Sequence, residues 1–378
     1  MQQIKSFIHY MKRRIIYLGM ALIMTSLGFA QEKGFVLKGC IPGMKDGIDV
    51  AILANEDSSY DVIAETKVKN GCFELRGKVD HPFLCTLTTN NLGLIEKDSL
   101  SKDTIKWTYT PIFIDNVEMK LETTDYKYVP SDWSITPNFR IIGGNVQKDF
   151  NEYYQRLYEA TNGNEQKIVE KDSEVIKTFI LSHPKSVVSA YFANRILLRG
   201  YSLSNEQVSQ LEKAIVAVPE DTARFSLFKE RIKYAKETTV GSKLMNLEIA
   251  DQNGITANLV DIIPQGEFVL VDFWASWCGQ CLEAMPSIKE LSDKYKNKLT
   301  VISVSCDRAL KAWKSAMEKH DMPWAQYILT KQGYNDFFKK YRVGDGVPYF
   351  TLITPDGKVT KAPQNVEEIK EILSNYYK

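Results

Sequence analysis

The sequence predicts an α/β domain with a mixed sheet flanked by helices in its last third, preceded by a small antiparallel β domain and a helical connector. Three patterns support this fold class. Short β-type runs separated by turn residues fill residues 34–140, the apolar period becomes helical over 145–237, and strand-like and helix-like runs alternate from 238 onward. At 378 residues the chain exceeds the size at which one core usually keeps growing, so several structural units are expected.

The first 30 residues have the three parts of a secretory signal peptide. A basic segment, 12–14, precedes the apolar run 15–27, and the small residues that follow would allow cleavage after Ala30. The apolar run is shorter than the roughly 20 residues that a spanning helix needs, so a retained membrane anchor is the less favoured alternative. We therefore expect an exported, periplasmic protein.

Residues 31–144 are predicted to form an antiparallel β sandwich or barrel. Asn70-Gly71 is the strongest hairpin signal in the chain. The strands expected here are 35–40, 48–53, 62–68, 72–79, 83–88 and 112–119.

Residues 145–237 are predicted to form a connector of four or five helices. Phe150 and Tyr154 begin an aromatic stripe at helical spacing, which we interpret as core and not as a ligand site. A capping-box pattern begins at Ser204, and Pro184 is placed at an expected helix start.

Residues 238–378 are predicted to form the α/β domain with a mixed sheet. Its strands and helices alternate along the chain. The expected strands are 268–274, 299–305 and 349–353, and the expected helices follow Cys278, surround 313–317 and span 366–376.

A Cys-x-x-Cys pair, Cys278 and Cys281, lies where the strand 268–274 meets a helix. Unpaired N–H groups and the helix dipole at such a junction favour a thiolate at the first cysteine. The pair is therefore suited to thiol-disulfide exchange, with Cys278 attacking and Cys281 resolving the mixed disulfide. Trp277 is expected to form a flat rim that limits access to the thiols.

Two alternatives exist for this pair. A structural zinc site needs four ligands, and the sequence has no second closely spaced Cys or His pair. Two buried cysteines could also fall at this spacing by chance, but Trp277 and Gly279 supply the shield and tight turn that an exposed thiol requires. We expect no metal, and no cofactor beyond the redox-active disulfide Cys278–Cys281.

The segment 269–281, VLVDFWASWCGQC, resembles the active-site segment of the thioredoxin superfamily, and residues 243–378 are similar to its extracytoplasmic TlpA/ResA-type branch. Further matches are Pro286, the run 301–307 and Gly346-Val347-Pro348. The resemblance implies a thioredoxin-like fold and a thiol-disulfide oxidoreductase that acts on protein disulfides.

The β-type region resembles the poorly characterised N-terminal domain that often precedes TlpA-like domains in Bacteroidetes-type exported proteins. Residues 70–73, Pro82, 113–115 and 141–144 carry this similarity. Its glycines and apolar alternation recur in many β domains.

Three residues outside the cysteine pair are candidates for the site. Asp272 lies in the middle of an apolar strand, where burial would raise its pKa and let it accept the Cys281 proton; a buried acid holds this position in thioredoxins. The resemblance implies that Pro348 is a cis-proline facing the cysteines and that the backbone of Val347 pairs with a substrate strand. The alternative for Pro348 is a proline that only opens a strand. Trp313 and Trp324 are interpreted as structural.

Two departures from the family pattern concern redox tuning. Gly279 and Gln280 stand where Gly-Pro is usual, so a rigid ring is replaced by a polar amide, and the redox potential stays open in both directions. The acid that branch members often carry three positions after the second cysteine is Ala284 here. Glu283 is rotated from that position by about 100° on a helix, so it is not expected to replace the acid.

The leading functional hypothesis is an exported reductase of protein disulfides that an upstream membrane or thioredoxin-like donor recharges. A disulfide isomerase or oxidase remains an alternative, and so does a non-catalytic binding protein on the same scaffold. A peroxidase is disfavoured, because Ala275 and Ser276 replace the threonine and proline that it needs. Residues 34–237 could confer homodimerisation or target selection.

Composition argues against nucleic acid as a partner. The net charge is only +1, and four of the basic residues lie before Gln31. Export would place the other four cysteines where disulfides persist. We interpret Cys40, Cys72, Cys85 and Cys306 first as small buried residues, with a Cys72–Cys85 bridge as the alternative.

Overall fold

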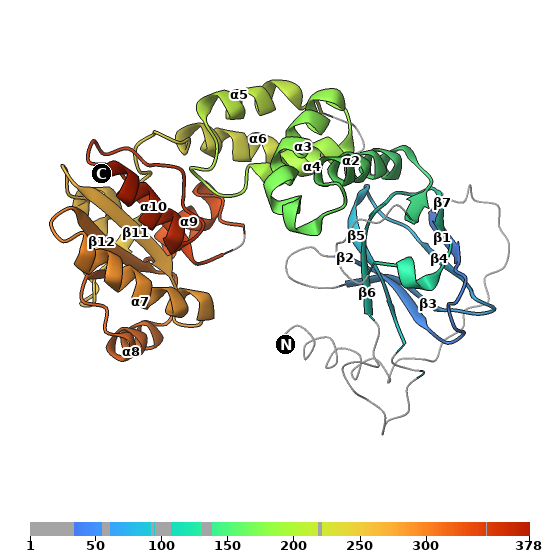
Figure 1. Cartoon of the computed structure of the whole chain (residues 1–378), viewed down its shortest axis with the longest axis horizontal. Helices are drawn as coiled ribbons and strands as arrows, with labels where there is room; N and C mark the ends of the chain where they lie inside the picture. The colour runs from blue at the N-terminus through green and yellow to red at the C-terminus, as the bar shows by residue number, and fades with distance from the viewer. Residues whose placement is uncertain are drawn as a thin grey trace. The chain divides into compact units, whose positions relative to one another are not determined.

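The computed structural model describes residues 34–54, 61–91, 94, 107–130, 138–217, 221–344 and 346–378 (Figure 1). The predicted leader and its cleavage position lie outside these residues. Within the described part of the chain, no helix has the length and apolar character needed to cross a membrane.

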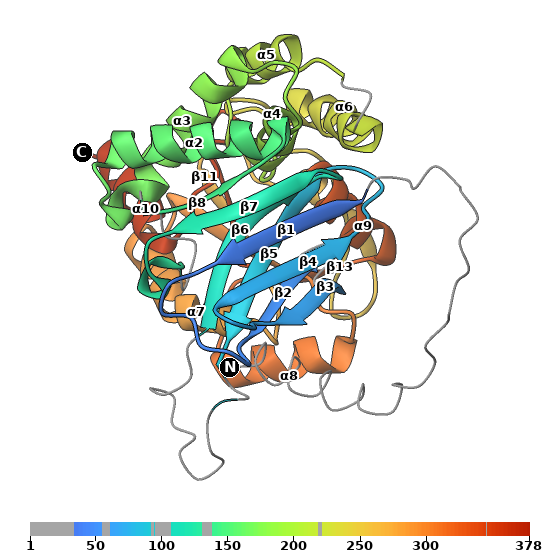
Figure 2. The same ribbon diagram turned by 90° about the vertical axis from the view of Figure 1, so that its right-hand side faces the viewer.

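The β domain consists of two four-stranded sheets, ordered β4-β1-β7-β8 and β3-β2-β5-β6. Its strands are β1 (Phe35–Cys40), β2 (Asp49–Ala54), β3 (Asp61–Lys67), β4 (Cys72–Gly77), β5 (Phe83–Asn90), β6 (Trp107–Ile114), β7 (Glu118–Thr123) and β8 (Phe139–Ile142). Figure 2 shows β4, β1 and β7 side by side. The pairing is antiparallel except between β1 and β7, which run parallel. The predicted fold class of this region is confirmed.

The single strand predicted over residues 112–119 is wrong. β6 ends at Ile114 and β7 begins at Glu118, with a turn between them. The Asn116 side chain accepts a hydrogen bond from Val79 N (3.0 Å) and donates one to Val79 O (2.6 Å). This polar residue is held by a neighbouring segment, so the apolar run is interrupted there.

The Asn70-Gly71 signal marks a real tight turn, but not an ordinary hairpin. Both residues have positive φ, 54° and 69°, as a two-residue turn of this type requires. Lys69 and Cys72 exchange backbone hydrogen bonds across it. The strands that it joins, β3 and β4, then belong to different sheets, so the turn links the two layers of the sandwich.

The interpretation of Cys40 and Cys72 as small buried residues is wrong, and so is the alternative of a Cys72–Cys85 bridge. Cys40 is directly opposite Cys72 in the antiparallel β1–β4 register, and the two form a disulfide. Cys40 is exposed and Cys72 half-buried, so neither is a buried core residue. Cys85 lies buried on β5 in the other sheet, with its thiol 3.8 Å from Phe83 O. The register between β1 and β4 decides this pairing.

The described part of residues 145–237 contains five α-helices, as predicted: α2 (Asn145–Thr161), α3 (Ile168–Ser182), α4 (Val187–Ile196), α5 (Asn205–Ala214) and α6 (Thr222–Glu237). The capping box at Ser204 is present. Pro184 does not open a helix; it lies in the turn before α4, whose N-cap is Ser186. Phe150 of α2 packs against Phe113 of β6 with ring centroids 5.0 Å apart, which confirms the core role of the aromatic stripe.

The C-terminal domain has a six-stranded mixed sheet ordered β10-β9-β13-β12-β11-β14. β11, β12 and β13 run parallel, and β14 runs antiparallel to β11. The strands are β9 (Glu248–Ala250), β10 (Thr256–Asn258), β11 (Phe268–Trp274), β12 (Leu299–Ser305), β13 (Ala325–Leu329) and β14 (Tyr349–Ile353). The helices are α7 (Gly279–Lys294), α8 (Leu310–His320), α9 (Lys331–Lys340) and α10 (Val366–Tyr376).

Ring contacts assign helices to the two faces of β11. Phe268 packs against Tyr376 of α10 at 4.8 Å between centroids, whereas Phe273 stacks on Phe337 of α9 at 4.3 Å. Side chains alternate between faces along a strand, so Asp272 shares the α10 face with Phe268. Helix α7 contacts α10 and therefore covers this same face. Asp272 thus lies on the sheet face beneath the helix that carries the second cysteine.

Candidate active site

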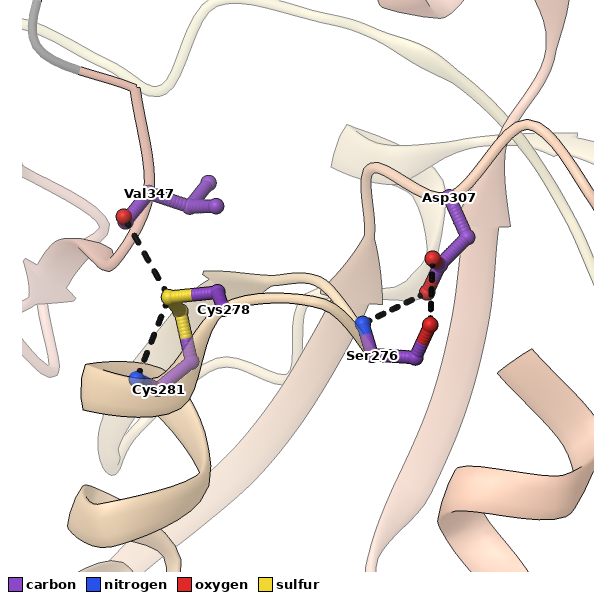
Figure 3. Close-up of a disulfide and its surroundings, with 5 residues drawn as sticks. All are labelled: Ser276, Cys278, Cys281, Asp307 and Val347. Carbon is purple, nitrogen blue, oxygen red and sulfur yellow. Dashed lines mark hydrogen bonds between the residues drawn. A yellow bond between two sulfur atoms is a disulfide. The ribbon is translucent and has the colours of Figure 1, made fainter. Parts of the chain in front are cut away.

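The cysteine pair is positioned by the end of β11 and the start of α7. All seven residues of β11 are buried, so the strand is fixed in the sheet centre. Cys278 is the N-cap of α7, and its amide donates to Ala275 O at 3.0 Å. Its sulfur accepts a hydrogen bond from Cys281 N at 3.1 Å, which satisfies one of the first free amides of the helix (Figure 3).

Cys278 and Cys281 are joined in a disulfide at the start of α7. Cys278 is 7% exposed and Cys281 1%, so Cys278 is the more accessible residue of the pair. The carbonyl oxygen of Val347 lies 3.4 Å from Cys278 Sγ. A disulfide sulfur carries no proton, so this contact becomes a hydrogen bond only when Cys278 is a thiol. The amide of Cys281, in contrast, would stabilise a thiolate.

The peptide bond between Val347 and Pro348 is cis, as the sequence predicts. Both residues are half-buried and immediately precede β14, which pairs with β11. The loop before the neighbouring strand β14 therefore brings Val347 to Cys278 (Figure 3).

Asp272 is 1% exposed, and burial raises its pKa to about 7. Ser303 faces it on β12 and donates a hydrogen bond from Oγ to the carboxylate (2.9 Å), which opposes that rise in pKa. Trp324 Nε1 donates to the same Ser303 Oγ at 2.7 Å. Trp324 was predicted to be structural only, and Ser303 was not singled out. The alternating pattern of the two parallel strands was the available signal, since it places Asp272 and Ser303 on one face.

Asp307 is a second buried carboxylate near the cysteines that the sequence analysis did not single out. Its oxygens accept hydrogen bonds from Ser276 N (2.9 Å), Ser276 Oγ (2.7 Å) and Ser305 Oγ (2.7 Å). Figure 3 shows it beside the turn that leads to Cys278. Its position just after the run 299–305, at the carboxyl end of a parallel strand, was the signal for a site residue.

The remaining predicted residues surround the disulfide. Trp277 is 67% exposed, and Gly279 and Gln280 are exposed in the first turn of α7. Glu283 points to solvent while Ala284 is half-buried, so the helix rotation expected between them is observed. Cys306 is buried, and burial raises the pKa of its thiol. Among the residues that the structure describes, no group of three or more His, Cys, Asp or Glu could hold a metal ion.

Two family models match the chain. A model described as thioredoxin-like matches residues 266–359, which include both cysteines and the cis-proline. A model of a domain of unknown function, DUF4369, matches residues 35–150, which include the strands β1–β8. The second match agrees with the predicted N-terminal domain.

Individual proteins match the C-terminal region. The thiol-disulfide oxidoreductase ResA of Bacillus cereus is 30% identical over 155 residues, covering 41% of this chain and 86% of ResA. Thioredoxin 1 of Chlorobaculum tepidum is 43% identical over 51 residues, covering 13% of this chain and 50% of that protein. The solved thioredoxin domain of a thiol-disulfide oxidoreductase from Bacteroides vulgatus is 28% identical, with a TM-score of 0.33 and coverage of 36% of this chain and 96% of that domain.

Proposed function

Because the chain belongs to the thioredoxin-like thiol-disulfide oxidoreductases, we propose that it reduces protein disulfides through a dithiol–disulfide cycle of Cys278 and Cys281. One observation carries the proposal. The disulfide caps α7 with the sulfur of Cys278, its more accessible residue, next to both the Cys281 amide and the Val347 carbonyl.

In the reduced protein, Cys278 as thiolate attacks one sulfur of the substrate disulfide. A mixed disulfide forms, and the other substrate sulfur leaves as a thiolate. Cys281 then loses its proton and attacks Cys278 Sγ, which releases the second substrate thiolate and forms the Cys278–Cys281 disulfide. The substrate gains two electrons and the protein loses two, so an external dithiol donor must restore the reduced form.

Asp272 is proposed to accept the Cys281 proton. Its pKa of about 7 lets it change protonation near neutral pH, which is what a general base needs there. Its place on the sheet face covered by α7 supports this role, and the Ser303 and Trp324 hydrogen bonds keep the carboxylate oriented. Val347 is proposed to pair with the substrate backbone beside Pro348, and Trp277 to limit access.

We also propose that the protein acts outside the cytoplasm. The leader pattern of residues 1–30 supports this, and the exposed Cys40–Cys72 disulfide is consistent with an oxidising compartment. A membrane or thioredoxin-like dithiol would then be the electron donor.

The test is a redox titration of the full chain in glutathione buffers, followed by thiol alkylation and mass spectrometry of the peptide that contains both Cys278 and Cys281. This readout reports the redox state of the Cys278–Cys281 pair separately from that of the Cys40–Cys72 disulfide. A potential near that of thioredoxin, about −270 mV, supports a reductase, and one of about −120 to −180 mV would instead indicate an oxidase or isomerase.

Turnover is tested with oxidised insulin as the protein disulfide. The wild-type dithiol is expected to reduce it, and Cys278→Ser is expected to abolish the reaction. The Cys40→Ser/Cys72→Ser variant is the matched control, since it removes the other disulfide and should keep full activity. A pair that never cycles between oxidation states would contradict the proposed function.

A further inference from the structure

A short segment after α4 contacts the chain on both sides of the cis-proline. We define the connector turn as residues 197–201, and the Pro348 loop as residues 341–344 with 346–349. Arg199 N donates to Arg342 O at 2.7 Å, and Gly200 N donates to Tyr341 O at 2.6 Å. On the other side of the proline, Tyr349 OH donates to Gly200 O at 2.8 Å. The connector turn therefore holds both ends of the Pro348 loop.

Arg342 adds a second set of bonds. Arg342 is 4% exposed, and its guanidinium donates to Leu197 O (2.5 Å), Thr238 Oγ1 (2.6 Å) and Lys340 O (3.2 Å). Burial lowers the pKa of Arg342 to about 10, so the group stays charged at neutral pH. A buried charge is tolerated only where hydrogen bonds surround it, so these acceptors fix the side chain in place.

Gly200 leaves little room for a side chain between these segments. A Cβ built there would lie 3.1 Å from Tyr341 O and 3.2 Å from Tyr349 OH. Glycine is favoured here because two backbones approach closely, and an added Cβ would push the neighbouring atoms apart by a few tenths of an ångström.

The backbone around these contacts is held in an uncommon conformation. Arg199, Tyr201 and Arg342 have φ of 75°, 58° and 54°, in the left-handed region that non-glycine residues rarely occupy. Such conformations persist where surrounding contacts determine them, and they cluster at functional sites. All three residues lie in the two hydrogen-bonded segments, Arg199 and Tyr201 in the connector turn and Arg342 in the Pro348 loop.

We propose that the connector turn and Arg342 are positioning residues that hold Val347 and Pro348 in place for the backbone of a polypeptide disulfide. This rests on the proposed function. A polypeptide substrate pairs its extended backbone with the backbone of Val347, so its binding depends on where Val347 lies. A small disulfide has no such backbone, and its reaction depends only on access to the Cys278 sulfur. The helical region thereby sets affinity for protein substrates without touching the reacting sulfurs.

The experiment compares two substrates in single turnovers of the pre-reduced full chain: oxidised insulin, and the small disulfide 5,5′-dithiobis(2-nitrobenzoic acid). Gly200→Ala and Arg342→Gln are each expected to raise the half-saturating insulin concentration about tenfold, equal to about 1.4 kcal/mol. The rate constant for the small disulfide should change by less than about twofold. Arg342→Lys, which keeps the charge, should recover part of the insulin affinity.

Arg231→Gln is the matched control. Arg231 is also a partly buried arginine in the helical region, but its guanidinium donates to Asn194 O (3.1 Å) and Asn194 Oδ1 (3.4 Å). It should leave both reactions unchanged. An equal insulin defect in Arg231→Gln, or a parallel loss of both reactions in the Gly200 and Arg342 variants, would overturn the proposal.

Hydrogen–deuterium exchange on the folded proteins gives a second readout. Gly200→Ala should speed exchange in the peptide that contains Val347 while leaving β11 protected, and unchanged exchange there would also overturn the proposal. A wild-type protein that reduces neither substrate would instead contradict the proposed function itself, and this proposal with it.

Discussion

At the scale of single residues, one carboxyl group of this site, that of Asp272, lies in apolar surroundings. Asp272 is flanked along β11 by buried apolar residues, and one hydroxyl donates to it. Desolvation outweighs that hydrogen bond, so the carboxyl is neutral below about pH 7. A group of this kind changes both rate and stability over the same pH range.

The first prediction concerns the rate. Asp272→Asn removes the proposed proton acceptor for Cys281, and release of the mixed disulfide should slow by about a hundredfold at pH 8. Below pH 7 wild-type Asp272 is itself protonated, so the difference between the two proteins should shrink. Stopped-flow release of thiol from a preformed mixed disulfide at Cys278 measures this. A ratio of rates that is constant from pH 5 to 9 would exclude Asp272 as the base.

The second prediction concerns stability. The folded pKa of Asp272 is raised from 3.8 to about 7, so the folded state binds the proton more tightly than the unfolded state. Its contribution to stability is fully present below about pH 4 and is lost as pH rises to about 7, a fall of about 4 kcal/mol at most. Urea unfolding of oxidised wild type against Asp272→Asn should therefore show the variant to be more stable at pH 8. Equal stability at pH 8 would mean that the carboxyl is not desolvated.

The third prediction concerns Asp307, which orients the turn before Cys278. Asp307→Ala leaves the Ser276 amide and two hydroxyls without their acceptor, at about 1–3 kcal/mol for each group that stays buried. The free energy of unfolding should fall, and attack by Cys278 on a small disulfide should slow. Ser276→Ala is the control, since it removes one hydroxyl and keeps the hydrogen bond from the backbone amide of residue 276 to Asp307. A larger defect in Ser276→Ala than in Asp307→Ala would contradict this role.

At the scale of elements, strongly patterned segments could be predicted and weakly patterned ones could not. The predicted bounds of β11, β12, β14 and α10 agree with the structure because each combines an apolar run with flanking turn residues. β13 and α9 were missed. β13 carries a buried glutamine, and α9 reads KQGYNDFFKK, with a glycine and few apolar residues. Packing against the rest of the domain determines both the strand β13 and the helix α9, and their local sequence patterns do not.

Disulfide pairing was not predictable for a different reason. Cys40, Cys72 and Cys85 all lie on predicted strands, and the sequence does not say which strands pair. β3 and β4 belong to different sheets, and the antiparallel pairing of β4 with β1 places Cys40 opposite Cys72. Long-range topology therefore decides a covalent bond that local patterns leave open.

The fourth prediction belongs to this element. The Cys40–Cys72 disulfide closes a loop with a sequence separation of 32, which corresponds to about 3–4 kcal/mol in the chain-entropy treatment. Cys40→Ser/Cys72→Ser should lower the free energy of unfolding of the β domain by roughly this amount. Circular dichroism in urea measures it, with Cys278→Ser/Cys281→Ser as the control for a disulfide elsewhere. A variant as stable as wild type would show that the unfolded chain is already compact here.

At the scale of the whole molecule, hydrogen bonds between buried polar groups join the helical region to the C-terminal domain. The Tyr201 hydroxyl accepts a hydrogen bond from Met245 N at 2.7 Å, and within the C-terminal domain Tyr341 OH donates to Met245 O. Tyr201, Tyr341 and Tyr349 are each at most 1% exposed. The resemblance to thioredoxins covers the cysteines and the cis-proline, but Gly200 and Tyr201 lie before residue 238, which that resemblance does not reach. They were therefore absent from the predicted site.

The last prediction separates the C-terminal domain from its helical neighbour. A fragment of residues 238–378 loses Gly200 O as the acceptor for Tyr349 and Leu197 O as the acceptor for Arg342, and it exposes the ring of Tyr341. Water can bond the groups that the fragment exposes, so each lost hydrogen bond lowers the stability by about 0.5–1.5 kcal/mol, and the fragment should be less stable than the same domain in the full chain. Urea unfolding followed by near-ultraviolet circular dichroism measures this, and Arg342→Gln in both lengths is the control. In the fragment that substitution should have a smaller effect, because the Leu197 acceptor is already gone while Thr238 Oγ1 and Lys340 O remain. Equal losses in both lengths would show that the domain does not depend on the helical region.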